Sequence, residues 1–298
     1  MKILLFGKNG QVGWELQRSL APLGELIALD TDSSELCGDF TDPDGLIRTI
    51  RAVAPDVIVN AAAYTAVDKA ESEPELARTI NALASGVLAQ EAKRGNAWLI
   101  HYSTDYVFDG SGDQPWRETD ATAPLSVYGT TKLEGEQLIR QAGCNHLIFR
   151  TSWVYGMRGG NFAKTMLRLA RERDSLTVVN DQIGAPTGAD MLADVTAHTI
   201  RTALQRPELS GLYHLVAAGE TSWHDYAGFV IDFARRAGVP LKVAPDSINA
   251  VPTRDFPLPA QRPLNSRLNT AKLQSGFGLT LPVWQNGVTR MLTEILDK

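Results

Sequence analysis

Short apolar segments alternate with amphipathic segments through the first half of the chain, and this alternation constrains the fold more than any other feature. Residues 3–6 are all apolar and end at Gly7, which is typical of a strand buried on both faces. Val12, Leu16 and Leu20 then recur at helical spacing. Strands that alternate with helices predict a parallel, doubly wound sheet of the α/β class. Further strands are expected at residues 26–30, 57–59, 98–102 and 147–150, and helices near 46–53, 76–93 and 132–141.

A glycine-rich turn lies between the first predicted strand and the first predicted helix. Gly7, Gly10 and Gly13 stand at the spacing G-x-x-G-x-x-G, with Gln11 and Val12 between the last two. Such glycines let the backbone approach a pyrophosphate, and the first N–H groups of the helix face the anion. The glycines can instead serve only the tight turn, but the flanking strand and helix favour a dinucleotide site.

Asp30 is expected at the end of the second strand. A carboxylate there can accept a hydrogen bond from the adenosine ribose of a dinucleotide, which favours NADH over NADPH. Lys8 in the turn would offset the repulsion of a 2′-phosphate, so both cofactors stay open. A solvated strand end is the alternative interpretation of Asp30.

Tyr128 and Lys132 are four residues apart, on one side of a predicted helix. An isolated tyrosine has a pKa near ~10, and a neighbouring cation lowers that pKa. Such a tyrosine can give a proton to a carbonyl oxygen while hydride reaches the carbon. Because the same spacing is common on solvated helix surfaces, its place in the fold has to decide between the two interpretations.

Ser103, Thr104 and Asp105 follow the predicted strand at 98–102 and so belong to a carboxyl end of the sheet, where open α/β sheets bind ligands. Thr104 is expected to hydrogen bond to the same carbonyl oxygen as Tyr128. A helix N-cap or a turn is the alternative for Ser103.

Composition excludes several other classes of protein. The net charge is −5, and the 29 Lys and Arg residues are scattered without a run, which argues against a nucleic-acid partner. No apolar stretch reaches membrane-spanning length. A predicted strand follows Met1 directly, and the two cysteines suit a reducing compartment. We therefore expect a cytoplasmic enzyme that acts on small molecules.

Taken together, the glycine turn, Asn60-Ala61-Ala62, Ser103-Thr104-Asp105 and Tyr128-x-x-x-Lys132 stand in the order of the extended short-chain dehydrogenases, which the chain resembles over its whole length. Six segments are similar, more narrowly, to the dTDP-4-dehydrorhamnose reductase family. The resemblance implies a Rossmann-type fold and reduction of the C4 keto group of dTDP-4-dehydro-L-rhamnose by NADPH or NADH. This is the last step in the synthesis of dTDP-L-rhamnose, a precursor of lipopolysaccharide O-antigen. The six segments are LLFGKNGQVGWEL, NAAAYTAVDKAE, HYSTDYVFDG, FRTSWVYG, DQIGAPTG and RPLNSRLNT.

The resemblance also implies roles for single residues. Tyr128 would donate the proton, Lys132 would be its partner and a cofactor ligand, and Thr104 with Asp105 would face the substrate. Trp153 would contact the substrate, and Arg262 its phosphate, although Arg262 can equally form a surface salt bridge. The cofactor contacts implied are Gly7, Gly10, Gln11, Val12, Gly13, Asp30, Asp39, Phe40, Ala62, Ala63, Tyr64, Thr65, Tyr128 and Lys132.

Some members of this family form homodimers around Mg²⁺, and Glu15, Asp190 and Glu294 fall at the matching positions. Carboxylate oxygens suit Mg²⁺. Position 190 carries Asp where Glu is expected, so solvated surface carboxylates are the alternative.

Beyond Thr151 the alternation of strands and helices is less regular. Helices are predicted at 162–173, 223–237 and 283–296, with a strand at 176–179. We expect a dinucleotide-binding domain over residues 1–150 and a smaller C-terminal substrate-binding lobe over 151–298, interleaved with the first.

Two other functions remain open at the level of sequence. A nucleotide-sugar epimerase or dehydratase shares the fold and the Tyr-Lys pair, but dehydratases of the family carry an Asp-Glu pair where this chain has Asp105 and Tyr106. A non-catalytic NADP-binding regulatory subunit is the second alternative, and the intact Tyr128 and Lys132 argue against it.

Overall fold

The computed structural model describes residues 1–296, and its centre is a six-stranded sheet in which all neighbouring strands are parallel. The strand order is β10-β5-β4-β3-β1-β2. Because β1 pairs with β2 on one side and β3 on the other, the order of the sheet reverses there, which opens a crevice at its carboxyl edge. The strands are β1 (Lys2–Phe6), β2 (Glu25–Leu29), β3 (Val57–Asn60), β4 (Trp98–Thr104), β5 (His146–Thr151) and β10 (Gly211–His214).

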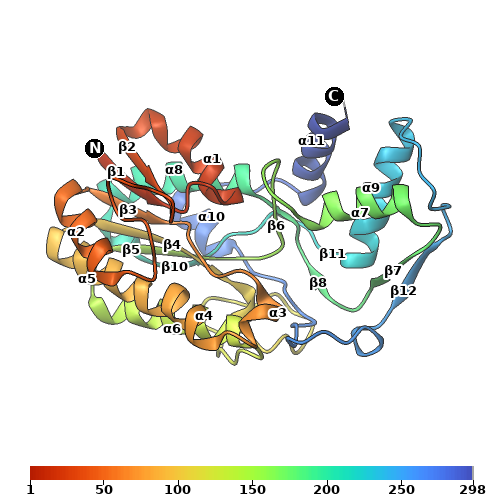
Figure 1. The fold of residues 1–298 in the computed structure, drawn as a ribbon, viewed down its shortest axis with the longest axis horizontal. Helices are drawn as coiled ribbons and strands as arrows, with labels where there is room; N and C mark the ends of the chain where they lie inside the picture. Colours follow the sequence, from red (N-terminus) through yellow and green to blue (C-terminus); the bar gives the residue numbers. More distant parts are fainter. Residues whose placement is uncertain (297–298) are drawn as a thin grey trace.

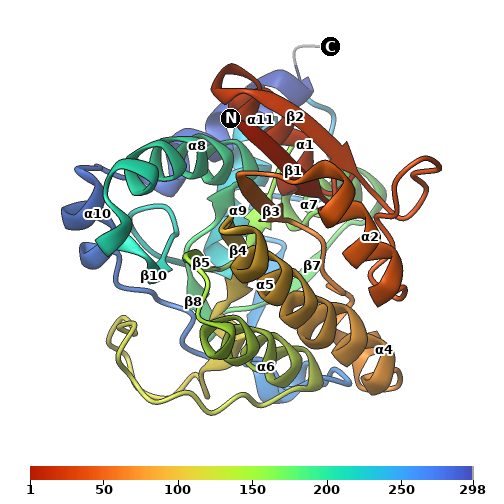
Figure 2. The same cartoon turned by 90° about the vertical axis from the view of Figure 1, so that its left-hand side faces the viewer.

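Helices cover both faces of this sheet (Figures 1 and 2). α1 packs against α8 on one face, and α5 packs between α2 and α6 on the other. This arrangement confirms the doubly wound α/β fold. The helices are α1 (Gln11–Leu20), α2 (Pro43–Val53), α3 (Val67–Ala70), α4 (Pro74–Arg78), α5 (Ala84–Gly95), α6 (Val127–Ala142), α8 (Ala189–Gln205) and α10 (Ala271–Phe277).

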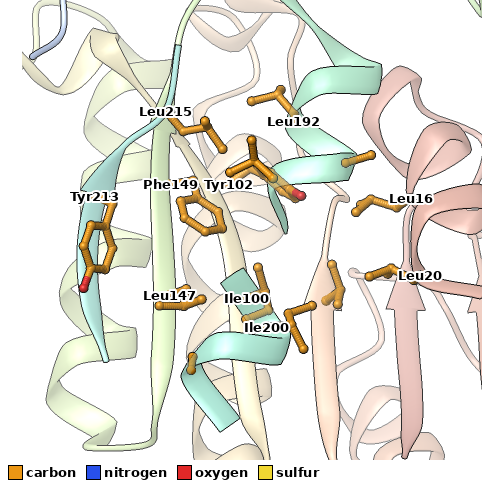
Figure 3. Close-up of a cluster of buried hydrophobic side chains, with 14 of the residues drawn as sticks. Leu16, Leu20, Ile100, Tyr102, Leu147, Phe149, Leu192, Ile200, Tyr213 and Leu215 are labelled. Atoms are coloured by element: carbon orange, nitrogen blue, oxygen red, sulfur yellow. The ribbon is translucent and has the colours of Figure 1, made fainter. Parts of the chain in front are cut away.

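A continuous apolar core lies between the sheet and the two helices α1 and α8 (Figure 3). The sequence did not predict α8 or β10, which follow residue 151 and yet complete this core. The buried face of α8 is rich in Ala and Thr, including Thr196 and Thr199, so its apolar periodicity is weak. The core side chains labelled in Figure 3 are Leu16, Leu20, Ile100, Tyr102, Leu147, Phe149, Leu192, Ile200, Tyr213 and Leu215.

A second hydrophobic cluster lies at the other end of the molecule, at the right of Figure 1. It is formed by α7, α9 and α11 with short paired strands. All its elements come from beyond residue 151, whereas α8, β10 and α10 return to the large sheet. Its elements are β6 (Val154–Tyr155), α7 (Phe162–Glu172), β7 (Leu176–Val179), β8 (Ile183–Gly184), β9 (Thr187–Gly188), β11 (Thr221–Ser222), α9 (Trp223–Arg236), β12 (Ile248–Val251) and α11 (Trp284–Leu296).

Two local features differ from the sequence-based expectations. The helix expected at 76–93 is divided into α4 and α5 by a π-helical turn at Thr79–Leu83. α6 begins five residues before Lys132, because the Ser126 side chain accepts a hydrogen bond from the Gly129 N–H. Over the described residues, none of the helices combines the length and hydropathy that a bilayer crossing requires.

Candidate active site

The glycine-rich turn after β1 has the close backbone contacts that only glycine permits. Gly7 has a φ of +85°. A Cβ atom on Gly7 would lie 2.6 Å from the Ala62 nitrogen, and one on Gly13 would lie 1.9 Å from the Gly7 oxygen. No side chain of the described residues caps the start of α1, so its first N–H groups stay available at the turn. These donors and this shape fit a pyrophosphate.

Asp30 supports this turn from the end of β2. Its Oδ2 accepts the Asn9 N–H at 2.9 Å, and its Oδ1 accepts the Thr31 N–H at 2.8 Å. These bonds connect the glycine-rich turn to the loop that follows β2. The role of Asp30 toward a cofactor stays a prediction.

The loop between β2 and α2 borders an open cavity of about 600 Å³, a size that suits a nucleoside. Asp39 and Arg48 are among its lining residues. Phe40 does not line it, because its ring is buried edge-on against Phe6 with centroids 5.5 Å apart. Only the backbone of Phe40 can therefore meet an adenine.

The segment after β3, residues 60–65, is held by two buried asparagines. Asn60 Oδ1 accepts the Ala62 N–H at 3.1 Å, and Asn81 Oδ1 accepts the Tyr64 N–H at 2.9 Å. Asn81 lies in the π-helical turn and also donates to Thr131 Oγ1 on α6. These bonds place residues 60–65 between the glycine-rich turn and α6, and Ala63 and Thr65 lie in the same segment.

Tyr128 lies in the first turn of α6 and meets Thr104 at the end of β4. Burial raises the pKa of Tyr128 to about 12, and the nearby Thr104 side chain partly offsets that increase. The sequence-based expectation was a lowered pKa caused by Lys132, and it was wrong for this ligand-free arrangement. Tyr128 is consequently protonated at neutral pH, which is the state that an acid requires.

Lys132 is almost completely buried, with 2% of its surface exposed. Its Nζ donates to the Tyr102 carbonyl at 2.6 Å and lies 3.3 Å from His101 Nε2. These contacts explain why Lys132 does not act on the Tyr128 phenol. Burial lowers the pKa of Lys132 to about 8, against a smaller opposing effect of Glu136.

Asp105 is buried beside Thr104, and only one of its carboxylate oxygens is satisfied. Oδ1 accepts the Thr104 hydroxyl at 3.1 Å, whereas Oδ2 has no partner among the described residues. Burial raises the pKa of Asp105 to about 6, although the nearby Ser266 and Thr104 hydroxyls act in the opposite direction. The Oδ2 atom is thus available to a substrate hydroxyl.

This carboxyl predicts a specific dependence of stability on pH. Its folded-state pKa of about 6 exceeds the ordinary 3.8, so its contribution to stability is present at acid pH and is lost as pH rises through 6. In Asp105→Asn, the free energy of unfolding should therefore improve relative to wild type by about 2–3 kcal/mol between pH 4 and pH 8. Urea unfolding at both pH values measures this change. A constant difference between the two proteins would show that Asp105 ionises normally.

Trp153 and Arg262, the predicted substrate contacts, are held differently. Trp153 has a φ of +49°, a strained conformation for a bulky residue, and its ring stacks on Trp223 with centroids 3.7 Å apart. Arg262 forms a bidentate pair with Asp68 on α3, at 3.0 and 2.9 Å. The salt-bridge interpretation of Arg262 therefore describes this structure.

Glu15, Asp190 and Glu294, the predicted Mg²⁺ ligands, line one small pocket together with Arg290. Arg290 lies 3.5 Å from Asp190 Oδ2 and 3.3 Å from Glu294 Oε1. Within residues 1–296, no three His, Cys, Asp or Glu side chains are grouped closely enough to hold a metal ion. Because Arg290 already pairs with two of the three carboxylates, the residues as arranged do not fit the ion, and Mg²⁺ stays a prediction.

The sequence analysis missed a set of buried polar residues behind the catalytic pair. Glu136 accepts the Ser103 hydroxyl at 2.5 Å and pairs with Arg150 through two hydrogen bonds of 2.9 and 2.6 Å. The signal was present, because Glu136 lies one helical turn beyond Lys132, and Ser103 lies on the same strand face as His101.

The comparisons with known proteins agree with this geometry. The family model described as "RmlD substrate binding domain" matches residues 1–296. The dTDP-4-dehydrorhamnose reductase of Escherichia coli K12 is 63% identical over 295 residues, with 99% of this chain and 98% of that protein covered.

Two solved structures extend the similarity to the fold. One is a dTDP-4-dehydrorhamnose reductase from Clostridium acetobutylicum, with a TM-score of 0.88, 34% identity and complete coverage of both chains. The other is a dTDP-4-dehydrorhamnose reductase from Bacillus anthracis in complex with NADP, with a TM-score of 0.87, 34% identity and coverage of 98% of this chain and 99% of that chain. With a turn shaped for a dinucleotide and a Tyr-Lys pair at the carboxyl edge of its sheet, this chain belongs to the dTDP-4-dehydrorhamnose reductase family.

Proposed function

We propose that this protein reduces the C4 keto group of dTDP-4-dehydro-L-rhamnose to give dTDP-L-rhamnose, with NADPH or NADH as the reductant. The observation that carries the proposal is the position of Tyr128. Its phenol meets Thr104 at the end of β4, and the raised pKa keeps it protonated at neutral pH. A protonated phenol beside a second hydroxyl is suited to bind and protonate a keto oxygen. The 63% identity to the Escherichia coli reductase supports the choice of sugar.

In this scheme the chain's own residues orient the keto group and supply one proton. Thr104 and Tyr128 hydrogen bond to the oxygen at C4, and Tyr128 passes its proton to that oxygen as negative charge develops. Asp105 would hold a neighbouring sugar hydroxyl with Oδ2, and Lys132 of α6 would hold the cofactor, whose nicotinamide would supply the hydride.

We propose both NADPH and NADH as reductants because Asp30 and its surroundings do not favour one of them exclusively. The carboxylate of Asp30 repels a 2′-phosphate, but it is already engaged by two backbone N–H groups. Arg48 in the nucleoside cavity is largely exposed and can meet a phosphate there. The NADP complex of the Bacillus anthracis protein supports use of the phosphorylated cofactor.

The alternative functions have less support. Tyr106 occupies the position after Asp105 and packs edge-on against Tyr128, with ring centroids 5.5 Å apart. Burial raises the pKa of the Tyr106 phenol well above its usual value, so it is a poorer base for water elimination than the carboxylate that dehydratases carry there, which argues against a dehydratase. An epimerase would regenerate its cofactor within each turnover, and a regulatory subunit would not turn over.

The test is to supply purified protein with the keto sugar nucleotide and either reduced cofactor. We expect one NAD(P)H oxidised for each sugar reduced, and dTDP-L-rhamnose identified by NMR. Product formation without net oxidation of the cofactor would indicate an epimerase or dehydratase. Reduction of related keto sugar nucleotides but not of this one would remove the substrate assignment and leave the reductase assignment intact.

We also propose a cytoplasmic location and a role in O-antigen synthesis. Cys37 and Cys144 are both free thiols, which suits a reducing compartment. A homodimer would use the surface near Glu15 and Arg290, where Val283 is 46% exposed.

A further inference from the structure

A chain of buried polar side chains connects β3, β4 and α6 directly behind the catalytic pair. Asn60 on β3, His101 on β4 and Lys132 on α6 are each 2% exposed or less. Asn60 Nδ2 lies 3.1 Å from His101 Nδ1, and His101 Nε2 lies 3.3 Å from Lys132 Nζ. Because these side chains are buried, each donor in the series needs an acceptor on its neighbour.

The orientation of the Asn60 amide is fixed by its other contacts. Its Oδ1 accepts the Ala62 N–H, so its Nδ2 faces His101 Nδ1 and Ser85 Oγ. The Ser85 hydroxyl donates to the Asn81 carbonyl at 2.9 Å, so Ser85 Oγ accepts from Asn60. Asn60 is therefore a donor toward His101.

This donor determines the tautomer of His101. Burial lowers the pKa of His101 well below its usual range, with smaller contributions in the same direction from Lys132 and His146, so the ring is neutral. Since Nδ1 accepts from Asn60, the single ring proton is on Nε2. The Nε2–H consequently points at Lys132 Nζ.

An ammonium group has no lone pair and cannot accept this hydrogen bond, whereas a neutral amine can. A neutral Lys132 would accept from His101 Nε2 and still donate to the Tyr102 carbonyl. We propose that His101, oriented by Asn60, is a positioning residue that favours the neutral amine of Lys132 in the ligand-free enzyme. A cofactor that offers Lys132 an acceptor would then promote its protonation from solvent.

The other charged groups around Lys132 are consistent with this arrangement. Glu136, one turn further along α6, favours the ammonium form, but it is paired with Arg150 of β5 and bonded to Ser103 of β4. Tyr128, one turn before, is neutral at working pH. His146 on β5 acts on His101, and its Nδ1 is bonded to the Cys144 carbonyl.

The first test measures the protonation of Lys132 directly, in ligand-free protein labelled with ¹³C at the lysine Cε atoms. The Lys132 signal is assigned as the one absent from Lys132→Met. In His101→Gln the side-chain oxygen can turn toward the ammonium, so we expect the apparent pKa of Lys132 to rise by one pH unit or more. Asn60→Ser removes the amide donor that fixes the His101 tautomer, and Asn60 does not contact Lys132. This variant should therefore also raise the apparent pKa of Lys132.

His146→Gln is the matched control, because it removes a nearby histidine that does not contact Lys132, and it should leave the titration unchanged. A folded His101→Gln protein with an unaltered or lowered Lys132 pKa would overturn the proposal. If that variant does not fold, the Asn60→Ser titration decides in the same way.

A second test measures turnover, so unlike the NMR titration it rests on the proposed function. The decline of kcat/KM for the reduced cofactor at alkaline pH should move upward with the NMR titration in both variants. A shifted NMR titration without a shifted kinetic profile would leave the network intact and contradict the role of Lys132 in turnover.

Discussion

Tyr128→Phe should lower kcat for reduction of the keto sugar by roughly 10²–10⁴-fold, while the affinity for NADPH changes little. The substitution removes the phenol proton beside Thr104, and the remaining ring still packs edge-on against Tyr106. Single-turnover kinetics measures the chemical step, and equilibrium titration of the cofactor measures binding.

Tyr213→Phe is the control for loss of a phenol elsewhere. Tyr213 lies on β10 and its hydroxyl donates to the Leu209 carbonyl, away from the carboxyl edge of β4. That variant should keep its kcat. If the rate of Tyr128→Phe stayed within about threefold of wild type, proton donation would have to come from another group, which contradicts the general-acid role.

The sequence predicted those parts of the fold that have strong local patterns. β1, β3 and β4 each contain a run of three or more apolar residues, and Gly7 and Gly13 are demanded by contacts that any side chain would break. The spacing of Tyr128 and Lys132 is also local, because the two residues lie one helical turn apart on α6. Their catalytic roles stay a prediction. Such features depend on neighbours in sequence or on a single well-defined turn.

The rest of the fold depended on contacts between distant segments. α8 is buried through Ala and Thr side chains, and it joins the large sheet only because α1 offers it a complementary face. The sequence therefore lacks the apolar periodicity that would have predicted α8. The division at residue 150 and the interleaving of the two parts stay predictions, and β10, from beyond that residue, pairs with β5 in the large sheet.

The roles of the candidate site residues stay a prediction, and the sequence did not predict their electrostatics. The spacing of Tyr128 and Lys132 suggests direct interaction, yet the Lys132 amine turns toward the Tyr102 carbonyl and His101. The pKa of the phenol is then governed by burial. Only the three-dimensional arrangement gives the partners of each proton, which is also why Asp68 went unnoticed as the partner of Arg262.

The second large effect is expected for Gly13→Ala. The new Cβ would lie 1.9 Å from the Gly7 oxygen and 2.7 Å from the Gly7 carbonyl carbon, so the backbone of the turn has to move away from α1. Overpacking of this kind costs about 1–3 kcal/mol of unfolding free energy, and a backbone clash belongs at the upper end. Displacement of the turn should also reduce the gain in Tm that NADPH produces, because that gain depends on its Kd.

Gly10→Ala provides the matched comparison for stability. Gly10 has a φ of −69°, and its Cβ would lie 3.5 Å from the same Gly7 oxygen, an ordinary contact distance. In the absence of cofactor, the unfolding free energy of Gly10→Ala should stay within about 0.5 kcal/mol of wild type. The two variants add the same methyl group to the same turn, so their difference isolates the packing of α1 against β1. Equal stabilities would mean that the turn is not held by this contact, and the argument that Gly13 shapes the pyrophosphate site would fail with it.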